Sequence, residues 1–299
     1  MPSEMDSWAR PVQSAADFPD IFREALQAML SAKEPFRRMI FAPADKWGLR
    51  KKTDPKLVFI HRDSFYFLEK VKKEVRSACF PLDNLLFIQY GTILLYSWLK
   101  ISGIIDGRVV TRMIEFNSVM RDLFKDLVTE VRHSIVESDQ VVCRSERKGG
   151  PDELKKFDGL GASDYKFMNY AKMSLLPGEQ VIHFIHQPLY RRKRYRFFSY
   201  TAIFPHLHIL TDKELIIIND EARKDQARYG GIWTYLPLRK VVDLRLVNDS
   251  ERGVFQLQIL LPHDQRITNF FALEQHAALH HAFLNNFNNY YYSEKDYAD

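Results

Sequence analysis

The second half of the chain contains a series of short apolar runs separated by polar turns, and this series limits what it can fold into. At its centre is HLHILTDKELIIINDE at residues 206–221, where two apolar runs flank a polar step. That pattern is typical of a β-hairpin. Similar runs precede it (EQVIHFI) and follow it (WTYLPL, VVDLRLV, VFQLQILL and RITNFF), and a helical stretch at 272–287 ends the series. Residues 176–287 are therefore predicted to form antiparallel strands followed by one helix.

The first half of the chain repeats this pattern. The leader at 29–43 parallels 173–188, and the hairpin at 56–70 parallels the one at 206–221. The step Phe80-Pro81-Leu82 parallels Leu236-Pro237-Leu238, and each leads into a strand-like run. Self-similarity of this length predicts two structurally equivalent units. One difference is expected between strands five and six, which a tight turn at Gly91 joins in the first copy and a longer loop at 248–253 joins in the second.

Both copies end in a predicted helix. In the first, an apolar stripe recurs at helical spacing from residue 116 to residue 135, which predicts a helix packed on the core. In the second, His280 falls on a stripe with Leu273, Ala277, Leu284 and Phe287, so we expect its side chain to be packed in the core.

Three short phrases carry a resemblance to a known family. They are Leu176-Pro177-Gly178-Glu179, Leu210-Thr211-Asp212 and Leu236-Pro237-Leu238. With seven strands and a terminal helix, the region resembles a pleckstrin-homology-like (PH-like) domain of the bacterial kind and is similar to GRAM domains. The resemblance implies an α+β, mainly β protein: two tandem PH-like domains, each a bent seven-stranded antiparallel sheet capped by a C-terminal helix.

The predicted organisation follows the repeat. A tail with a short helix covers 1–35, the first domain 36–136, and the second domain 173–288. A Gly-rich, charged linker covers 137–172, and a polar tail covers 289–299.

Composition places the chain among ordinary folded proteins. It has 299 residues, of which 46% are hydrophobic and 27% charged. The longest apolar segment, 85–105, is broken by polar residues and fits two strands better than a membrane span. The N-terminus lacks the pattern of a signal peptide, and two cysteines are too few for a disulfide framework. These features predict a cytoplasmic protein, with peripheral membrane attachment as one option.

Basic residues gather in the connection between the first two strands of each copy. In PH domains that bind inositol phospholipids, this connection carries the phosphate-binding residues, and clustered cations bind phosphate oxygens with charge-assisted hydrogen bonds. The predicted anion- or lipid-binding residues are Arg191, Arg192, Lys193, Arg194 and Arg196 in the second copy, and Lys46, Arg50, Lys51 and Lys52 in the first. The alternative is a solvated basic loop without a ligand.

Two other interpretations stay open. Basic and aromatic residues alternate at 190–198, as in proteins that bind single-stranded nucleic acid, but no second motif supports this, so nucleic acid is the less favoured anion. Eight of the ten histidines lie in the second copy, where His206/His208 and His276/His280 have metal-compatible spacing. An unrecognised enzyme or metal protein is thus an alternative.

No P-loop, GxGxxG, GxSxG or HExxH motif occurs in the chain. We therefore expect a non-enzymatic binding or adaptor module without catalytic residues, cofactor or metal. Its expected partners are proteins or an anionic membrane surface, and the duplication also allows self-association.

Overall fold

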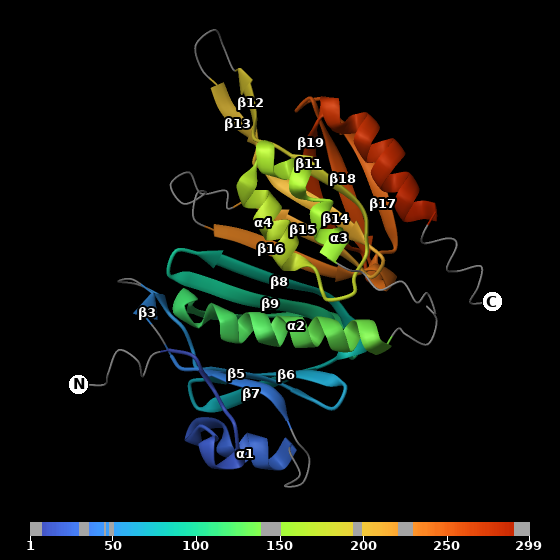
Figure 1. Cartoon of the computed structure of the whole chain (residues 1–299). Coiled ribbons are helices and arrows are strands. Elements are labelled where there is room, and N and C mark those ends of the chain that lie inside the picture. The colour runs from blue at the N-terminus through green and yellow to red at the C-terminus, as the bar shows by residue number, and fades with distance from the viewer. Residues whose placement is uncertain are drawn as a thin grey trace, which may run out of the picture. The chain divides into compact units, whose positions relative to one another are not determined.

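The computed structural model describes residues 8–29, 36–44, 46–47, 51–138, 151–193, 199–220 and 230–289. The chain divides into two compact units, Met1–Ser138 and Asp139–Asp299. Both are mainly β, and all their paired strands are antiparallel (Figure 1). No helix in the described ranges is long and apolar enough to cross a membrane.

The first unit begins with a short strand and a helix. Its elements are β1 (Arg10–Pro11), α1 (Asp20–Met29), β2 (Arg37–Ala42), β3 (Lys46–Trp47), β4 (Lys51–Lys52), β5 (Lys56–His61), β6 (Ser64–Val71), β7 (Glu74–Pro81), β8 (Leu85–Ile93), β9 (Tyr96–Ile105), β10 (Arg108–Asn117) and α2 (Arg121–Ser138). One sheet has the order β1-β2-β5-β6-β7, and β8, β9 and β10 pair consecutively. Strands β3 and β4 form a separate hairpin.

The second unit has the same succession. Its elements are α3 (Pro151–Lys155), α4 (Tyr165–Ser174), β11 (Val181–Gln187), β12 (Tyr190–Lys193), β13 (Ser199–Ile203), β14 (His206–Thr211), β15 (Glu214–Asn219), β16 (Gly230–Pro237), β17 (Asp243–Asp249), β18 (Val254–Leu261), β19 (Gln265–Ala272) and the π-helix η8 (Ala278–Leu284). Strand β11 pairs with β14, β14 with β15 and β15 with β16. Strands β17, β18 and β19 form a second sheet, and β12 and β13 form a separate hairpin.

The two units agree in detail as well as in order. The 3-10 turns η3 (Leu82–Asn84) and η6 (Leu238–Lys240) follow Pro81 and Pro237, which have nearly the same backbone angles. The amide of Leu82 donates to the carbonyl of Asp63 and that of Leu238 to Lys213, each over 2.9 Å. The hairpin expected at 206–221 is confirmed, with paired strands at 206–211 and 214–219.

The repeated unit begins earlier than the sequence pattern indicated. Each first sheet is preceded by a ten-residue helix, α1 or α4, that covers its outer face. Figure 1 shows α1 and α2 on opposite faces of the sheet that contains β5 to β7. In the second unit, residues 151–172, expected to belong to the linker, contain α3 and most of α4, and α4 packs on β14 and β15.

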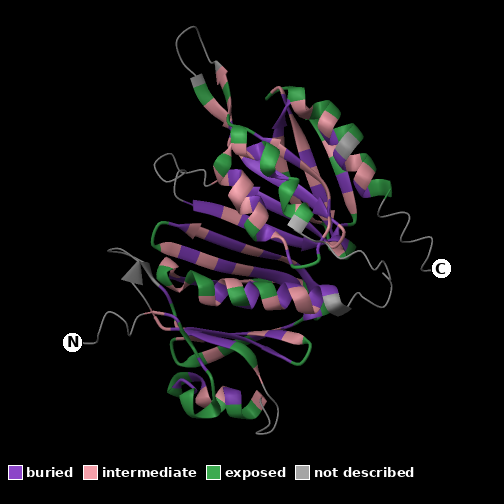
Figure 2. Cartoon of the chain, viewed as in Figure 1, coloured by how far each residue is buried: buried purple, intermediate pink, exposed green. Residues whose placement is uncertain are grey.

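Burial on both faces explains the unbroken apolar runs of the central strands. In the first unit, Phe22 and Leu26 of α1 pack against Phe59 on one face of β5, while Val58 and Ile60 are fully buried on the other. Strands β5 and β14 are buried along their whole length (Figure 2). A sheet buried on one face only would instead alternate apolar and polar residues.

The buried stripe predicted for the first terminal helix is largely confirmed, whereas the one predicted for the second is not. In α2 the expected stripe is largely confirmed, with Phe124, Leu127, Val131 and Ile135 buried, although Val119 before it is 56% exposed. In the second unit the expectation for His280 is wrong, because this residue is exposed. The buried residues there are Leu279, Phe283 and Phe287. The segment Ala278–Leu284 is π-helical, and the buried face runs through these three residues and not through the stripe counted from Leu273.

The turn expected at Gly91 lies elsewhere. Gly91 is inside β8, and the two-residue turn joining β8 to β9 is Leu94-Leu95. The strand partner of Gly91 is Trp98, and a Cβ atom at position 91 would overlap the indole ring. The glycine is therefore present because the ring of Trp98 covers the backbone there.

We predict that Gly91→Ala destabilises the first unit by about 1–3 kcal/mol, because the added methyl group forces Trp98 out of its position. Chemical denaturation with tryptophan fluorescence measures both effects. Gly159→Ala is the control, since nothing lies within 4 Å of a Cβ atom there. Equal stabilities for the two variants would contradict the explanation.

The phrases that carry the family resemblance meet in one buried hydrogen-bond network. Glu179 and Thr211 are almost completely buried, and the Thr211 hydroxyl donates to the Glu179 carboxylate over 2.6 Å. The second carboxylate oxygen accepts from the amide of Leu176 at 2.8 Å. The hydroxyl of Thr211 also accepts from the amides of Lys213 and Glu214, which closes the β14–β15 turn. These residues therefore join the start of the sheet to its central hairpin.

We predict that Thr211→Val lowers the free energy of unfolding of the second unit by about 1.5–3 kcal/mol, because it removes a hydrogen bond to a buried carboxylate while keeping the β-branched shape. Urea unfolding measures the change. Thr268→Val, on an exposed position of β19, makes the same chemical change at the surface and should have little effect.

Candidate anion-binding surface

The predicted basic residues lie on the separate hairpins. In each unit, the connection between the first sheet strand and the next folds as its own two-stranded ribbon, β3–β4 or β12–β13. Such a ribbon projects from the sheet that it interrupts (Figure 1). Each ribbon can therefore present backbone and side chains to a partner without disturbing the core.

In the first unit the ribbon contains three of the predicted lysines. In its backbone register Lys46 pairs with Lys52, and Trp47 pairs with Lys51. Arg50, the fourth predicted residue, lies outside the described residues.

In the second unit the ribbon carries Arg191, Arg192 and Lys193 on β12. Arg191 is exposed, and Arg192 is half-buried. The backbone of Lys193 pairs with Ser199. Arg194 and Arg196 lie outside the described residues.

The structure adds one cation that the sequence analysis did not select. The guanidinium of Arg192 donates to the carbonyl oxygen of Arg252, in the turn between β17 and β18. Arg252 itself lies 5.3 Å from the ring centre of Phe270 and 3.8 Å from a carboxylate oxygen of Asp249. The available signal was the longer loop at 248–253, which distinguishes the second copy from the first. Two arginines thus meet where the basic ribbon leaves the core.

Asp249 partly balances this charge. Its carboxylate accepts from the Arg252 amide at 3.1 Å and from the Gln256 side chain at 3.0 Å. These two hydrogen bonds, aided by the charge of Arg252, lower the pKa of Asp249. The carboxylate is therefore ionised at neutral pH and holds the turn in place beside Arg192.

The histidine pairs that the sequence singled out in the second unit are either buried in the core or exposed on the terminal helix. His206 and His208 are completely buried, and the ring centres lie 5.2 Å apart. Both rings pack against Phe271, and His208 also packs against Phe283. His276 and His280 lie 5.9 Å apart on the exposed terminal helix. Within the described ranges, no three His, Cys, Asp or Glu residues gather in a geometry that could hold a metal ion.

Burial lowers the pKa of four histidines in the second unit. It lowers the pKa of His183 and of His186, although the charge of Asp164 acts to raise the pKa of His186. Burial lowers the pKa of His206 to about 4. The pKa of His208 is well below its usual value for the same reason. All four rings are therefore neutral at pH 7 and become charged more readily in the unfolded chain.

We predict that the second unit loses stability on acidification below pH 6.5. The unfolded histidines take up protons there, whereas folded His206 does so only near pH 4, so the stability present at pH 7 falls progressively over this window. His206 alone accounts for a loss of about 2 kcal/mol by pH 5 and about 3 kcal/mol by pH 4.

Thermal unfolding at intervals between pH 7.5 and 5 checks this prediction. A His208→Leu variant should show a shallower fall in stability, because one of the buried titrating rings is gone. His280→Gln removes an exposed ring and should leave the slope unchanged. Parallel curves for all three proteins would contradict the assignment.

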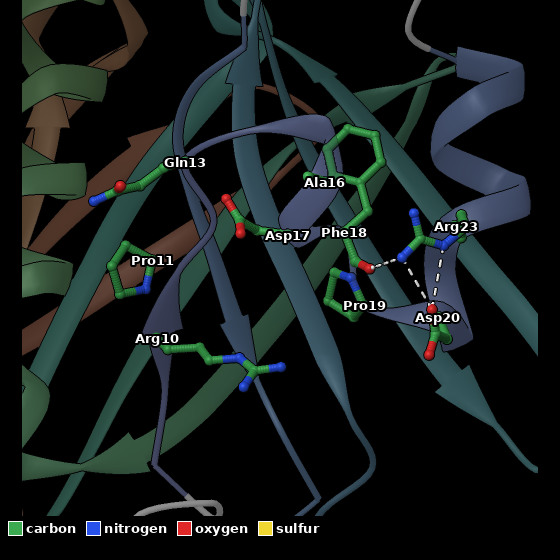
Figure 3. Close-up of a pocket in the computed structure, with 9 residues that line it drawn as sticks. All are labelled: Arg10, Pro11, Gln13, Ala16, Asp17, Phe18, Pro19, Asp20 and Arg23. Atoms are coloured by element: carbon green, nitrogen blue, oxygen red, sulfur yellow. Dashed lines mark hydrogen bonds and ion pairs between the residues drawn. The ribbon is translucent and has the colours of Figure 1, made fainter.

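A second surface feature is a polar hollow of about 450 Å³ on the N-terminal segment of the first unit (Figure 3). Its charged side chains are already engaged. The guanidinium of Arg23 binds Asp20 at 3.0 Å and the carbonyl of Phe18 at 2.9 Å, and Asp17 accepts from Ser14. Arg10 lies over the ring of Phe41. These pairs stabilise the segment preceding α1 and give no indication of a ligand.

No protein-family model matches the chain, and a search of curated proteins finds no match.

Proposed function

We propose that the chain is a non-enzymatic binding module in which two PH-like units engage an anionic phospholipid surface or a protein partner through their basic ribbons. The observation that carries the proposal is the extra hairpin in the first connection of each unit, β3–β4 and β12–β13, which contains the cations. Each unit has four strands in common in its first sheet (β2, β5, β6 and β7; β11, β14, β15 and β16), then three further strands and a terminal helix. This succession supports the PH-like identification.

Charge and duplication together suit weak binding to a surface. A basic residue near an anionic leaflet contributes about 1 kcal/mol, so one ribbon alone gives modest affinity. Two ribbons in one chain add their effects through effective concentration. The result is peripheral attachment that salt weakens, because exposed charges are screened.

A protein partner has a different place to bind. Strand β7 is at the edge of the first unit's five-stranded sheet, with no neighbour on its far side among the described residues. An extended peptide could add there as a further strand. Such binding would depend little on salt.

We predict that the protein sediments with anionic vesicles at low salt, and not with neutral vesicles or at high salt. Replacing Arg191, Arg192, Lys193, Arg194 and Arg196 with Gln should weaken binding at least tenfold, since about 1 kcal/mol is lost per residue. The matched control replaces five cations outside the ribbons, Arg76, Arg108, Arg121, Arg239 and Arg266, and should retain more binding at the same net charge.

Equal losses in the two variants would show attraction by total charge and overturn the assignment to the ribbon. Absence of binding by the unmodified protein would remove the membrane proposal and direct the search to protein partners. Stoichiometric zinc in the purified protein would favour the alternative based on the histidines. Competition by single-stranded nucleic acid at equal affinity would favour the nucleic-acid alternative.

A further inference from the structure

The turn between β8 and β9 in the first unit is made of two exposed leucines. Leu94 is 53% exposed and Leu95 is 66% exposed. Val119, itself 56% exposed, lies close by, since the amide of Ser118 donates to the carbonyl of Leu95 over 2.9 Å. Three large apolar side chains thus gather at one protruding point.

The local backbone makes this composition unfavourable. Leu94 has a φ angle of 49°, in the left-handed region that Gly and Asn adopt readily and Leu does not. A two-residue hairpin with a positive φ at its first turn position only prefers Gly there. Leucines here cost stability both through backbone strain and through exposure to water. Residues that destabilise the turn in two ways indicate a functional role, such as binding a partner.

The leucine turn lies at the same end of the unit as the basic ribbon. The amide of Lys70, at the end of β6, donates to Pro55, just before β5. The ammonium of Lys56, at the start of β5, is 3.7 Å from the carboxylate of Glu115, which accepts from Tyr96 at 2.9 Å. Tyr96 directly follows Leu95. The ribbon, the β6–β7 turn and the leucine turn are therefore neighbours.

Lysines lie at the same end of the unit as the apolar point. The β6–β7 turn consists of Lys72 and Lys73, both exposed. The strands of the ribbon contain Lys46, Lys51 and Lys52. Exposed leucines with lysines on neighbouring turns match the interface of an anionic bilayer, where acyl chains receive the apolar side chains and headgroups receive the charges.

The second unit lacks this apolar point. Its corresponding turn, at 250–253, has the polar sequence Ser-Glu-Arg-Gly, and there Arg252 contacts Arg192. The two units therefore present different chemistry at equivalent positions.

We propose that Leu94 and Leu95 insert into the interface of an anionic membrane and orient the first unit on it. This inference rests on the proposed membrane function and assigns a task to each unit: the first inserts and the second adds charge. The insertion is reversible, because two leucine side chains bury far less apolar surface than a spanning helix.

A favourable feature for testing is that the variant should improve the fold. Leu94→Gly with Leu95→Asn supplies the preferred residue at the position with positive φ, so its melting temperature should equal or exceed that of the unmodified protein. Its partition onto anionic vesicles should fall about tenfold or more, since both apolar side chains that insert are removed.

A fluorescent reporter tests insertion directly. In a background lacking Cys79 and Cys143, a polarity-sensitive dye is attached at Leu95→Cys, with Asp106→Cys as the control. Asp106 lies in the β9–β10 turn, at the far end of β9. Anionic vesicles at low salt should shift the emission of the dye at 95 to shorter wavelength and leave the dye at 106 unchanged.

The outcomes separate the two proposals. If the unmodified protein binds anionic vesicles but the Gly-Asn variant binds equally and the dye at 95 does not shift, insertion is overturned while the membrane function stands. If the unmodified protein does not bind, both proposals fail. If the dye at 95 shifts equally with neutral vesicles, the role of the lysines is overturned.

Discussion

The structure depends on covering both faces of a four-stranded antiparallel sheet. One face meets the closing helix, and the other meets α1 or α4. In the second unit, Phe167 of α4 packs on His186, and Tyr170 packs on Trp233. The apolar runs of β14 and β15, the burial of His206 and His208, and the low pKa values of these rings follow from this double cover. The ribbons and turns extend beyond this covered sheet, so their residues are not constrained by its packing.

The Glu179–Thr211 network shows how a short motif specifies a position in the fold. A carboxylate and a hydroxyl that would each be costly to bury alone become stable because each satisfies the other and nearby amides. In the first unit the position corresponding to Thr211, at the end of β5, is His61. The two copies thus share a topology while closing this turn with different chemistry.

Strand order was predictable where the apolar runs are bounded by turns, as at 206–219 and at the paired steps that contain Pro81 and Pro237. The sequence predicted a short helix before the first unit, where α1 lies, but not that α1 and α4 cover the sheets. Phe167 and Ala171 of α4 follow a Gly-rich stretch, and only tertiary contact shows what they cover. Gly91 resembles a turn residue until Trp98 is placed over it. His280 was misplaced because the stripe was counted from Leu273, whereas the buried face runs through Leu279, Phe283 and Phe287. The sequence placed the basic residues in the first connection of each copy but did not indicate that this connection folds as a hairpin, and the approach of Arg192 to Arg252 joins positions sixty residues apart.

The position of the covering helices has a consequence for synthesis. Both α1 and α4 precede the strands that they protect, and α2 and η8 follow every strand that they close. A chain made from its N-terminus therefore displays the apolar side of each covering helix before its sheet exists, and it holds an open sheet until the last helix has emerged. Each unit can become stable only when its final turn of helix leaves the ribosome, so loss of a few C-terminal residues at either helix should affect the yield of folded protein more than loss of the same number at a ribbon.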